Sequence, residues 1–264
     1  MRANNVKTIW EQGGAAVNGW LSIPSSWSAE VMAHLDWDSL TVDMQHGIAD
    51  LNACFHMMQA ISLTNTVPMV RVPWNIPDTI QRVLDMGAYG IVCPMINSRA
   101  ECEAFVGACR YHPMGYRSSG PIRARLYAGP DYMEKANETL ITMAMIETRQ
   151  AMDNLDDILS TPGLDSIYVG PSDLSLSLFG TPSVNLDNPE LVDALDTIFS
   201  TAKRHGIYIG IHTGSVAMAQ WCIDRGAQFV TMMSDSAIMS AASAQIIADV
   251  KGHTVKAVKK TDAY

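Results

Sequence analysis

Short apolar runs rich in β-branched residues recur along the chain, and each predicts a β-strand. The residues in these runs are almost all apolar and do not alternate with polar residues. This pattern is typical of strands in a parallel sheet that is buried on both faces. The eight runs cover residues 16–23, 39–44, 67–72, 89–95, 141–147, 165–170, 208–213 and 228–233.

The segments between these runs carry apolar residues every three or four positions, which predicts amphipathic helices. The clearest cover residues 77–87, 101–111, 149–160 and 189–206. Strand and helix therefore alternate, and eight such repeats favour a closed (β/α)8 TIM barrel of the α/β class over an open sheet. The length of 264 residues suits a single domain. We expect residues 1–264 to form that domain, with 251–264 as a flexible basic tail.

Motifs for nucleotide phosphates are missing from the sequence. No Gly-x-Gly-x-x-Gly follows an early strand, and no Gly-x-x-x-x-Gly-Lys-Ser/Thr occurs anywhere. One connection, residues 112–132, is longer than ordinary strand-to-helix loops and is rich in Gly, Pro and Arg. We interpret it as a candidate functional loop.

Charge and cysteine content narrow the class of protein. A net charge of −9 and a pI near 5.1 argue against a nucleic-acid partner, which needs a basic surface. Lysines gather only in the last residues, where a solvated helix end or frayed terminus explains them. No signal-like segment and no apolar run of about 18 residues occurs, so we expect no membrane partner and a cytoplasmic location. The five cysteines lack metal-site spacing and are interpreted as reduced structural thiols.

Candidate chemistry follows from the barrel, because barrel enzymes place their active sites at the carboxyl ends of the strands. Few polar residues lie at those ends. They are Asp43, Gln45, His46, Arg71, Glu147, the turn 170–173, His212, Thr213, Ser234 and Asp235.

Two carboxylates in this set are candidate metal ligands. Glu147 closes a long apolar run, where a buried carboxylate is costly unless it is paired, protonated or bound to a cation. Asp173 follows the next strand, and an all-oxygen pair with open positions suits Mg²⁺, Mn²⁺ or a similar ion. A salt bridge from Glu147 to Arg71 or Arg149 is the alternative, and the spacing does not separate the two.

His46 and Arg71 have similarly open interpretations. A neutral imidazole at His46 would suit a general base, or the residue is a structural hydrogen-bonding group. Arg71 would grip a carboxylate or an enolate oxygen, or form an ion pair with Glu147 or Asp43. No lysine lies at a predicted strand end, so a Schiff-base mechanism lacks its nucleophile and any enolate charge would need a metal.

At these residues the sequence resembles the HpcH/HpaI aldolase family, the class II pyruvate aldolases that cleave 4-hydroxy-2-oxo acids. The resemblance extends approximately from Gly19 to Val250. It rests on VDMQHG (42–47), RVPWNIPDTIQRVLDMGAYGIVCPM (71–95), CRYHPMGYR (109–117), the segment 145–180 with IETRQAMDNLDDIL and GPSDLS, and IGIHTG in the seventh strand.

The resemblance implies a divalent ion, Mg²⁺, Mn²⁺ or Co²⁺, held by Glu147 and Asp173. It also implies His46 as a base supported by Asp85, with Arg71 contacting the enolate of pyruvate. Backbone amides at the 170–173 turn would hold the substrate carboxylate, which agrees with an anion nest at that turn. The full expected substrate-binding set is Trp20, Arg71, Gly170, Ser172, Asp173 and His212.

The implied reaction is reversible cleavage of a 4-hydroxy-2-oxo acid to pyruvate, or a close 2-oxo acid, and an aldehyde through a metal-stabilised enolate. Four positions depart from the family pattern and leave the substrate open. Gln45 replaces a common Glu, Met145 a Gln, Ser118 a Gly, and His212 an aliphatic residue.

Other functions remain alternatives. Oxaloacetate decarboxylation or malyl-thioester cleavage would use the same enolate, and a non-catalytic 2-oxo-acid-binding barrel would follow if Gln45 disables proton transfer. The resemblance further implies a homo-oligomer, a hexamer or trimer of dimers, assembled through an exchanged C-terminal helix. The apolar segment 236–250 would be that helix, or it closes its own barrel.

Overall fold

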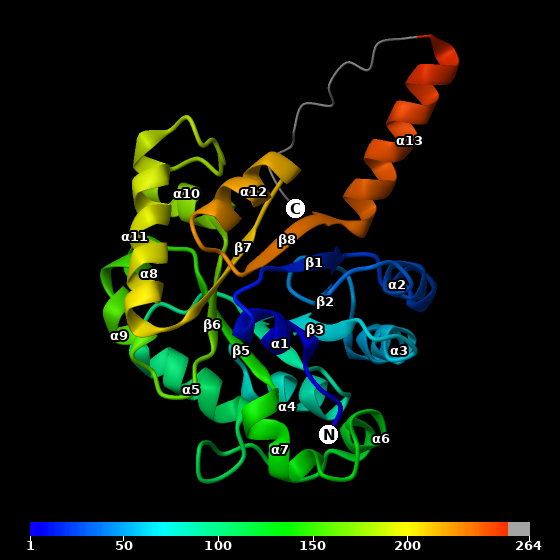
Figure 1. The fold of residues 1–264 in the computed structure, drawn as a ribbon, viewed down its shortest axis with the longest axis vertical. Helices are drawn as coiled ribbons and strands as arrows, with labels where there is room; N and C mark the ends of the chain where they lie inside the picture. The colour runs from blue at the N-terminus through cyan, green and yellow to red at the C-terminus, as the bar shows by residue number, and fades with distance from the viewer. Residues whose placement is uncertain (253–264) are drawn as a thin grey trace.

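A computed structural model describes residues 1–252 as one closed barrel of eight parallel strands, each hydrogen-bonded to the next in sequence (Figure 1). All eight strand predictions are confirmed. The strands are β1 Ala16–Leu21, β2 Ser39–Asp43, β3 Val67–Arg71, β4 Gly90–Cys93, β5 Ile141–Ile146, β6 Ser166–Val169, β7 Tyr208–His212 and β8 Phe229–Ser234. The predicted TIM barrel is therefore confirmed.

The barrel interior holds a buried polar cluster as well as apolar side chains. The side-chain oxygen of Asn18 accepts hydrogen bonds from Ser39 at 2.8 Å and Thr41 at 3.0 Å. The Asn18 amide donates to the Thr231 hydroxyl at 3.0 Å. All four residues are fully buried. Each hydroxyl and amide has a partner, so the cluster avoids the cost of unsatisfied polar groups in a barrel core.

Helices surround the barrel, and three of the four predicted helical segments are confirmed as α4, α5 and α11. The helices are α1 Asn5–Glu11, α2 Ser26–Ala33, α3 Leu51–Ile61, α4 Pro77–Asp85, α5 Arg99–Cys109, α6 Ile122–Ala128, α7 Tyr132–Thr139, α8 Arg149–Asp153, α9 Leu155–Leu159, α10 Pro171–Phe179, α11 Pro189–His205, α12 Val216–Asp224 and α13 Asp235–Lys251. The segment 149–160 divides into α8 and α9. Asn154 separates them, and its side chain donates to the Asn97 carbonyl at 2.8 Å.

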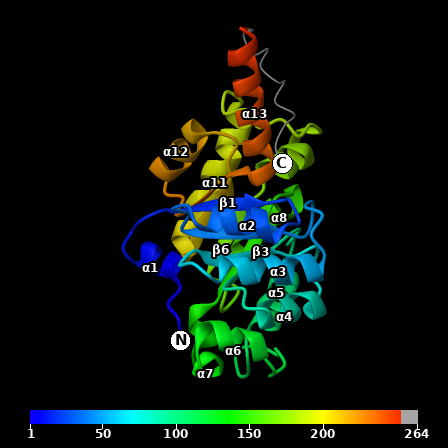
Figure 2. The same cartoon turned by 90° about the vertical axis from the view of Figure 1, so that its right-hand side faces the viewer.

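The long connection 112–132 is not a strand-to-helix loop. It runs from α5 through α6 to α7, which precedes β5, so it lies at the amino-terminal end of the barrel. In Figures 1 and 2, α6 and α7 lie on the side of the molecule that holds the N-terminus. The connection therefore lies at the end of the barrel opposite the strand carboxyl ends, and its role as a functional loop stays a prediction.

The last helix leaves the barrel instead of covering it. α13 contacts β1 and β8 near its start and then projects outward (Figures 1 and 2), with Met239, Ile246 and Val250 exposed. The predicted basic tail begins inside this helix, since Lys251 is its last residue, and residues 253–264 lie outside the described residues. Within residues 1–252, no helix is long and apolar enough to cross a membrane.

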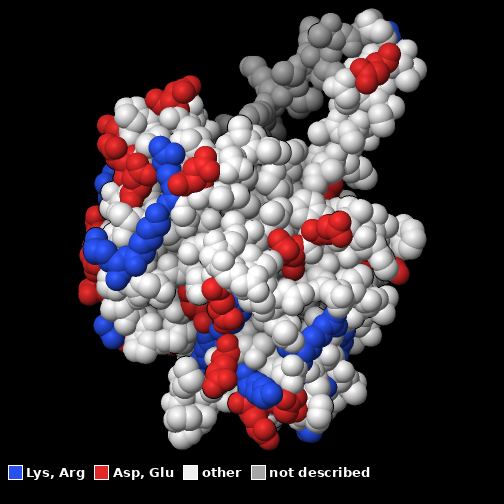
Figure 3. All heavy atoms as spheres, viewed as in Figure 1, with Lys and Arg blue, Asp and Glu red and all other residues white. Residues whose placement is uncertain are grey.

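An apolar groove lies beside the start of α13, between α12 and the β1–β8 seam. Its volume is about 440 Å³. The lining residues are Val17, Trp37, Val216, Ala219, Gln220, Ile223, Val230, Met232, Met233 and Ile238. None of them is charged, and the surface between α12 and α13 carries few charged side chains in Figure 3. A barrel helix following β8 would normally cover this position.

Candidate active site

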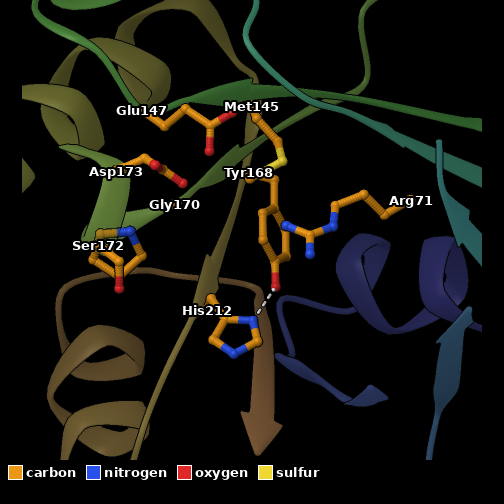
Figure 4. A pocket seen from close by; sticks show the side chains of 9 residues that line it. Arg71, Met145, Glu147, Tyr168, Gly170, Ser172, Asp173 and His212 are labelled. Atoms are coloured by element: carbon orange, nitrogen blue, oxygen red, sulfur yellow. Dashed lines mark hydrogen bonds between the residues drawn. The ribbon is translucent and has the colours of Figure 1, made fainter. Parts of the chain in front are cut away.

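A pocket lies at the carboxyl ends of β3, β5, β6 and β7 (Figure 4). It brings together six of the predicted site residues, Arg71, Glu147, Gly170, Ser172, Asp173 and His212, with Met145, Tyr168 and Pro171. The pocket is partly open to solvent, and its inner volume is about 20 Å³.

Glu147 follows β5 directly and is only 2% exposed. Its carboxylate accepts a hydrogen bond of 2.8 Å from the backbone N–H of Met95. Burial raises the pKa of Glu147, the charge of Asp173 adds to this effect and Met95 and Arg71 oppose it, with a resulting pKa of about 7. Within residues 1–252 no cation forms an ion pair with Glu147, so the alternative of a salt bridge to Arg71 or Arg149 is wrong.

Gly170 makes room for the Glu147 carboxylate. A Cβ atom at Gly170 would lie 2.4 Å from Oε2 of Glu147, a separation that real atoms do not tolerate. Gly170 is also the N-cap of α10, and Pro171 starts the helix. The first turn of a helix has backbone N–H groups without helical partners and a positive dipole end, so this edge of the pocket suits an anion.

The residues present fit a divalent cation. Asp173 lies in the first turn of α10, and its charge acts on Glu147. A cation between the two carboxylates would remove the repulsion that raises the pKa of Glu147. The part of the chain that the structure describes contains no cluster of three or more His, Cys, Asp and Glu side chains for a metal. Two carboxylates leave positions open for water and substrate, as hard divalent ions require.

Arg71, which lines the pocket, forms a buried ion pair with Asp43. Arg71 donates from Nε at 2.8 Å and from Nη2 at 2.6 Å to the two oxygens of Asp43. Asp43 also accepts from the backbone N–H groups of Gln45 and Gly47 and from the indole of Trp20. Burial alone would raise the pKa of Asp43, but Arg71 holds it below its usual value. The alternative interpretation of Arg71 as a partner of Asp43 is confirmed, and Arg71 lines the pocket as well.

Trp20 lies behind the pocket and is not among the residues that line it. Its ring stacks on Tyr168 with centroids 5.8 Å apart, and the Arg71 guanidinium lies 4.8 Å from its centre. A shift in the β1–β8 register between Asn18 and Trp20 accompanies this placement. Trp20 therefore supports Arg71 from behind rather than forming the pocket wall.

Tyr168 is a pocket residue that the sequence analysis missed. Its hydroxyl pairs with Nδ1 of His212 at 3.1 Å (Figure 4). Burial lowers the pKa of His212 to about 4, so the imidazole is neutral at neutral pH. The available signal was a tyrosine inside the apolar run 165–170, because a buried tyrosine hydroxyl usually needs a partner.

His46 lies just after β2, and its backbone N–H donates to Asp43 at 3.3 Å. Burial and the charge of Arg71 lower the pKa of His46, while Asp43 and Asp173 raise it. Asp173, a candidate metal ligand, is thus one of the charges that act on His46.

Asp85 does not support His46 within this chain. It is the last residue of α4, which leads back to the amino-terminal end of the barrel, and it pairs with Arg117 at 2.6 Å. His46 lies at the opposite end, after β2. The structure therefore does not bring His46 and Asp85 together within one chain, and their pairing stays a prediction.

Known proteins resemble the chain along nearly its whole length. Residues 19–242 match the HpcH/HpaI aldolase/citrate lyase family. A hydroxypyruvate/pyruvate aldolase from Rhizorhabdus wittichii is 42% identical over 248 residues, which cover 94% of this chain and 99% of that protein. A 4-hydroxy-2-oxo-heptane-1,7-dioate aldolase from Escherichia coli is 33% identical over 261 residues, which cover 97% of this chain and 98% of that protein. The crystal structure of a family member from Burkholderia cenocepacia superposes with a TM-score of 0.87 at 27% identity, covering 94% of this chain and 100% of that one.

Proposed function

Because the chain belongs to the HpcH/HpaI aldolase/citrate lyase family, we propose that it is an aldolase that reversibly cleaves 4-hydroxy-2-oxo acids to pyruvate, or a close 2-oxo acid, and an aldehyde. One observation carries the proposal most directly. Glu147 is a buried carboxylate without an ion-pair partner in the described chain, and it lies beside Asp173 at the start of α10. That arrangement suits a cation and a carboxylate-bearing ligand at the same point.

We propose that Glu147 and Asp173 hold a divalent ion, with Mg²⁺, Mn²⁺ and Co²⁺ as the candidates. Such an ion would supply Lewis acidity for a 2-oxo acid and would stabilise negative charge on the keto oxygen. The two side chains come from adjacent strands, one after β5 and one after β6.

The remaining roles follow from position. The backbone N–H groups of Ser172 and Asp173 begin α10 and would bind the substrate carboxylate. Arg71 would donate to the oxygen that becomes negative, because its Nη1 is not committed to Asp43. His46 would take the proton from the 4-hydroxyl group during cleavage and return one during synthesis. Its depressed pKa keeps the imidazole neutral and able to accept that proton at neutral pH.

The first experiment follows the methyl protons of pyruvate in deuterated water by NMR, using chelator-stripped protein with and without each metal. We expect exchange that requires a metal, is lost in Glu147→Ala and is strongly reduced in His46→Ala. His205→Ala is the matched control, since His205 lies at the end of α11 and pairs with Asp156. No exchange with any metal would contradict the proposal and favour a thioester lyase or a binding protein.

We further propose that the chain assembles as a homo-oligomer, a hexamer or trimer of dimers, by exchanging α13. The groove between α12 and β1 is apolar and lies where a helix after β8 normally packs. α13 projects away from it with apolar side chains exposed. A second copy of α13 would cover apolar surface on both subunits, which favours association. In such an assembly, Asp85 of one subunit would support His46 of another subunit.

Sedimentation analysis tests the exchange. Ile223→Arg places a charge in the groove, and Ile246→Arg places one on α13, so we expect both to shift the protein toward monomer. Thr197→Arg on α11 provides the control because Thr197 is exposed on another helix. Wild-type protein that sediments as a monomer would overturn the assembly proposal and leave the aldolase proposal intact.

A further inference from the structure

The pocket has two chemically different sides. Glu147, Asp173 and Ser172 lie on one side in Figure 4, and Tyr168 and His212 lie across from them. The first side would take the oxygens of a 2-oxo acid in the proposed reaction. Near the second side Met145 offers only an apolar thioether, and Arg71 is already assigned to the enolate oxygen in the proposed reaction. His212 is a polar side chain on this side that the proposed reaction does not use.

The direction of the Tyr168–His212 hydrogen bond follows from the chemistry of the two groups. A neutral phenol is a stronger proton donor than a neutral imidazole, and an imidazole nitrogen is the stronger acceptor. Tyr168 therefore donates to Nδ1 of His212 across their 3.1 Å separation. When Nδ1 of a neutral histidine accepts, the proton of the ring is on Nε2.

His212 is also fixed in orientation. Its ring meets the edge of Trp20 at a centroid distance of 5.2 Å and nearly at right angles, at 88°. Trp20 is itself anchored by its indole N–H to Asp43. A donor that is held by packing and by a directed hydrogen bond loses little conformational freedom when a ligand binds, which makes it effective in selection.

We propose that His212, held as its Nε2–H tautomer by Tyr168, donates a hydrogen bond to a hydroxyl group of the substrate. The pocket would then prefer hydroxylated carbon chains to their deoxy counterparts. The hydroxyl belongs either to the aldehyde, on the carbon next to its carbonyl group, or to C3 of the 2-oxo acid. This inference rests on the proposed aldolase function and adds its substrate class. A site built to bond a hydroxyl group discriminates against an analogue that lacks it.

The test compares kcat/KM for matched pairs of probes with metal-loaded enzyme. Glycolaldehyde against acetaldehyde, with pyruvate as the partner, tests a hydroxyl on the aldehyde. Hydroxypyruvate against pyruvate, with one aldehyde, tests a hydroxyl on the 2-oxo acid. We expect wild type to prefer the hydroxylated member of one pair, and His212→Leu to lose roughly three- to tenfold of that preference, the value of one neutral hydrogen bond. His212→Gln, which keeps an N–H donor, should restore part of it.

Tyr168→Phe separates positioning from direct contact, because it removes the hydroxyl that fixes the tautomer and keeps the aromatic ring. We expect it to reduce the same preference. Two-dimensional ¹H–¹⁵N NMR, with the signals of His212 identified through the leucine variant, should show the Nε2–H form in wild type and a mixture of tautomers in Tyr168→Phe. His56→Leu is the matched control for histidine loss, because His56 is exposed on α3.

Two outcomes overturn the inference. One is a wild type with no hydroxyl preference in either pair, and the other is a preference that stays the same in His212→Leu. If wild type still exchanges pyruvate protons in deuterated water, only the role of His212 fails and the aldolase proposal stands. Absence of exchange with every metal would instead remove the proposed function, and this inference with it.

Discussion

At the scale of single residues, some members of the candidate site were predictable from the sequence and others were not. Glu147 and Arg71 were predictable because each interrupts or ends an apolar strand with a charge, and such charges need a reason. Tyr168 was not predictable in this way. A tyrosine ring is common in an apolar core, and its single hydroxyl group does not mark the residue as functional. The placement of Asp85 depends on which end of α4 faces the site, and the implied pairing ignored that direction.

Replacing Gly170 by alanine tests the space around Glu147. The added Cβ would collide with the Glu147 carboxylate, so we expect weaker binding of Mn²⁺, by at least about tenfold if one ligand is displaced. Calorimetric titration of the metal-free protein measures it. Gly120→Ala is the control because no atom lies within 4 Å of the added Cβ. Equal Mn²⁺ affinity in wild type and Gly170→Ala would argue against Glu147 as a ligand.

His212 predicts a specific dependence of stability on pH. Its pKa is lowered from 6.5 to about 4 in the folded protein, so between these values the unfolded chain binds the proton more readily. The contribution of neutral His212 is fully present above pH 6.5 and is lost as the pH falls toward 4. Urea unfolding at pH 7 and pH 5 should show a smaller loss of free energy of unfolding in His212→Leu than in wild type. An identical loss in both proteins would contradict this.

At the scale of secondary-structure elements, periodicity predicted strands well and connections poorly. Apolar β-branched runs identified all eight strands because a closed parallel barrel buries both faces of every strand. The break between α8 and α9 escaped this approach, since it depends on the contact of Asn154 with Asn97, more than fifty residues away in sequence. The helix α6 within the connection 112–132 was not predicted, because the segment is short and rich in Gly, Pro and Arg.

Asp235 fixes the start of α13, which makes that helix testable as an element. It is 5% exposed and accepts hydrogen bonds from the backbone and hydroxyl of Ser22, both at 2.9 Å, and from Ser28 at 3.1 Å. Asp235→Ala leaves these donors unpaired, so we expect unfolding to become easier by at least about 2 kcal/mol. Chemical denaturation measures this. Asp249→Ala, near the end of the same helix, should change stability far less, because Asp249 is exposed and pairs only with Gln245 nearby.

At the scale of the whole molecule, the sequence indicated the barrel and an apolar last helix, but it did not decide where that helix packs. Both an exchanged helix and a self-closing helix need the same apolar residues in 236–250. The structure shows α13 pointing away from its own barrel, which argues against the self-closing helix, and the exchange stays a proposal. That direction depends on the hydrogen bonds between Asp235, at the start of α13, and Ser22, in the loop after β1. Sequence patterns do not reveal such contacts, because the two residues are far apart in the chain.

If copies of the chain complete one another, the melting temperature should rise with protein concentration, because association stabilises the folded state by mass action. Differential scanning calorimetry over a hundredfold range of concentration measures this. Ile246→Arg should melt at a lower temperature and with a smaller dependence on concentration. A melting temperature that is the same at all concentrations for both proteins would indicate that association between subunits does not stabilise the fold.

Closure of the barrel through the β1–β8 seam also sets an order for biosynthesis. β1 ends at Leu21, and its partner β8 begins at Phe229, so the first strand reaches the ribosome exit long before the strand that covers its free edge. At about 5 to 20 residues per second, that delay is roughly 10 to 40 s. During this interval the backbone groups along one side of β1 are open to other nascent chains. Yield in rapidly growing cells should therefore depend on chaperones that shield the emerging half-barrel.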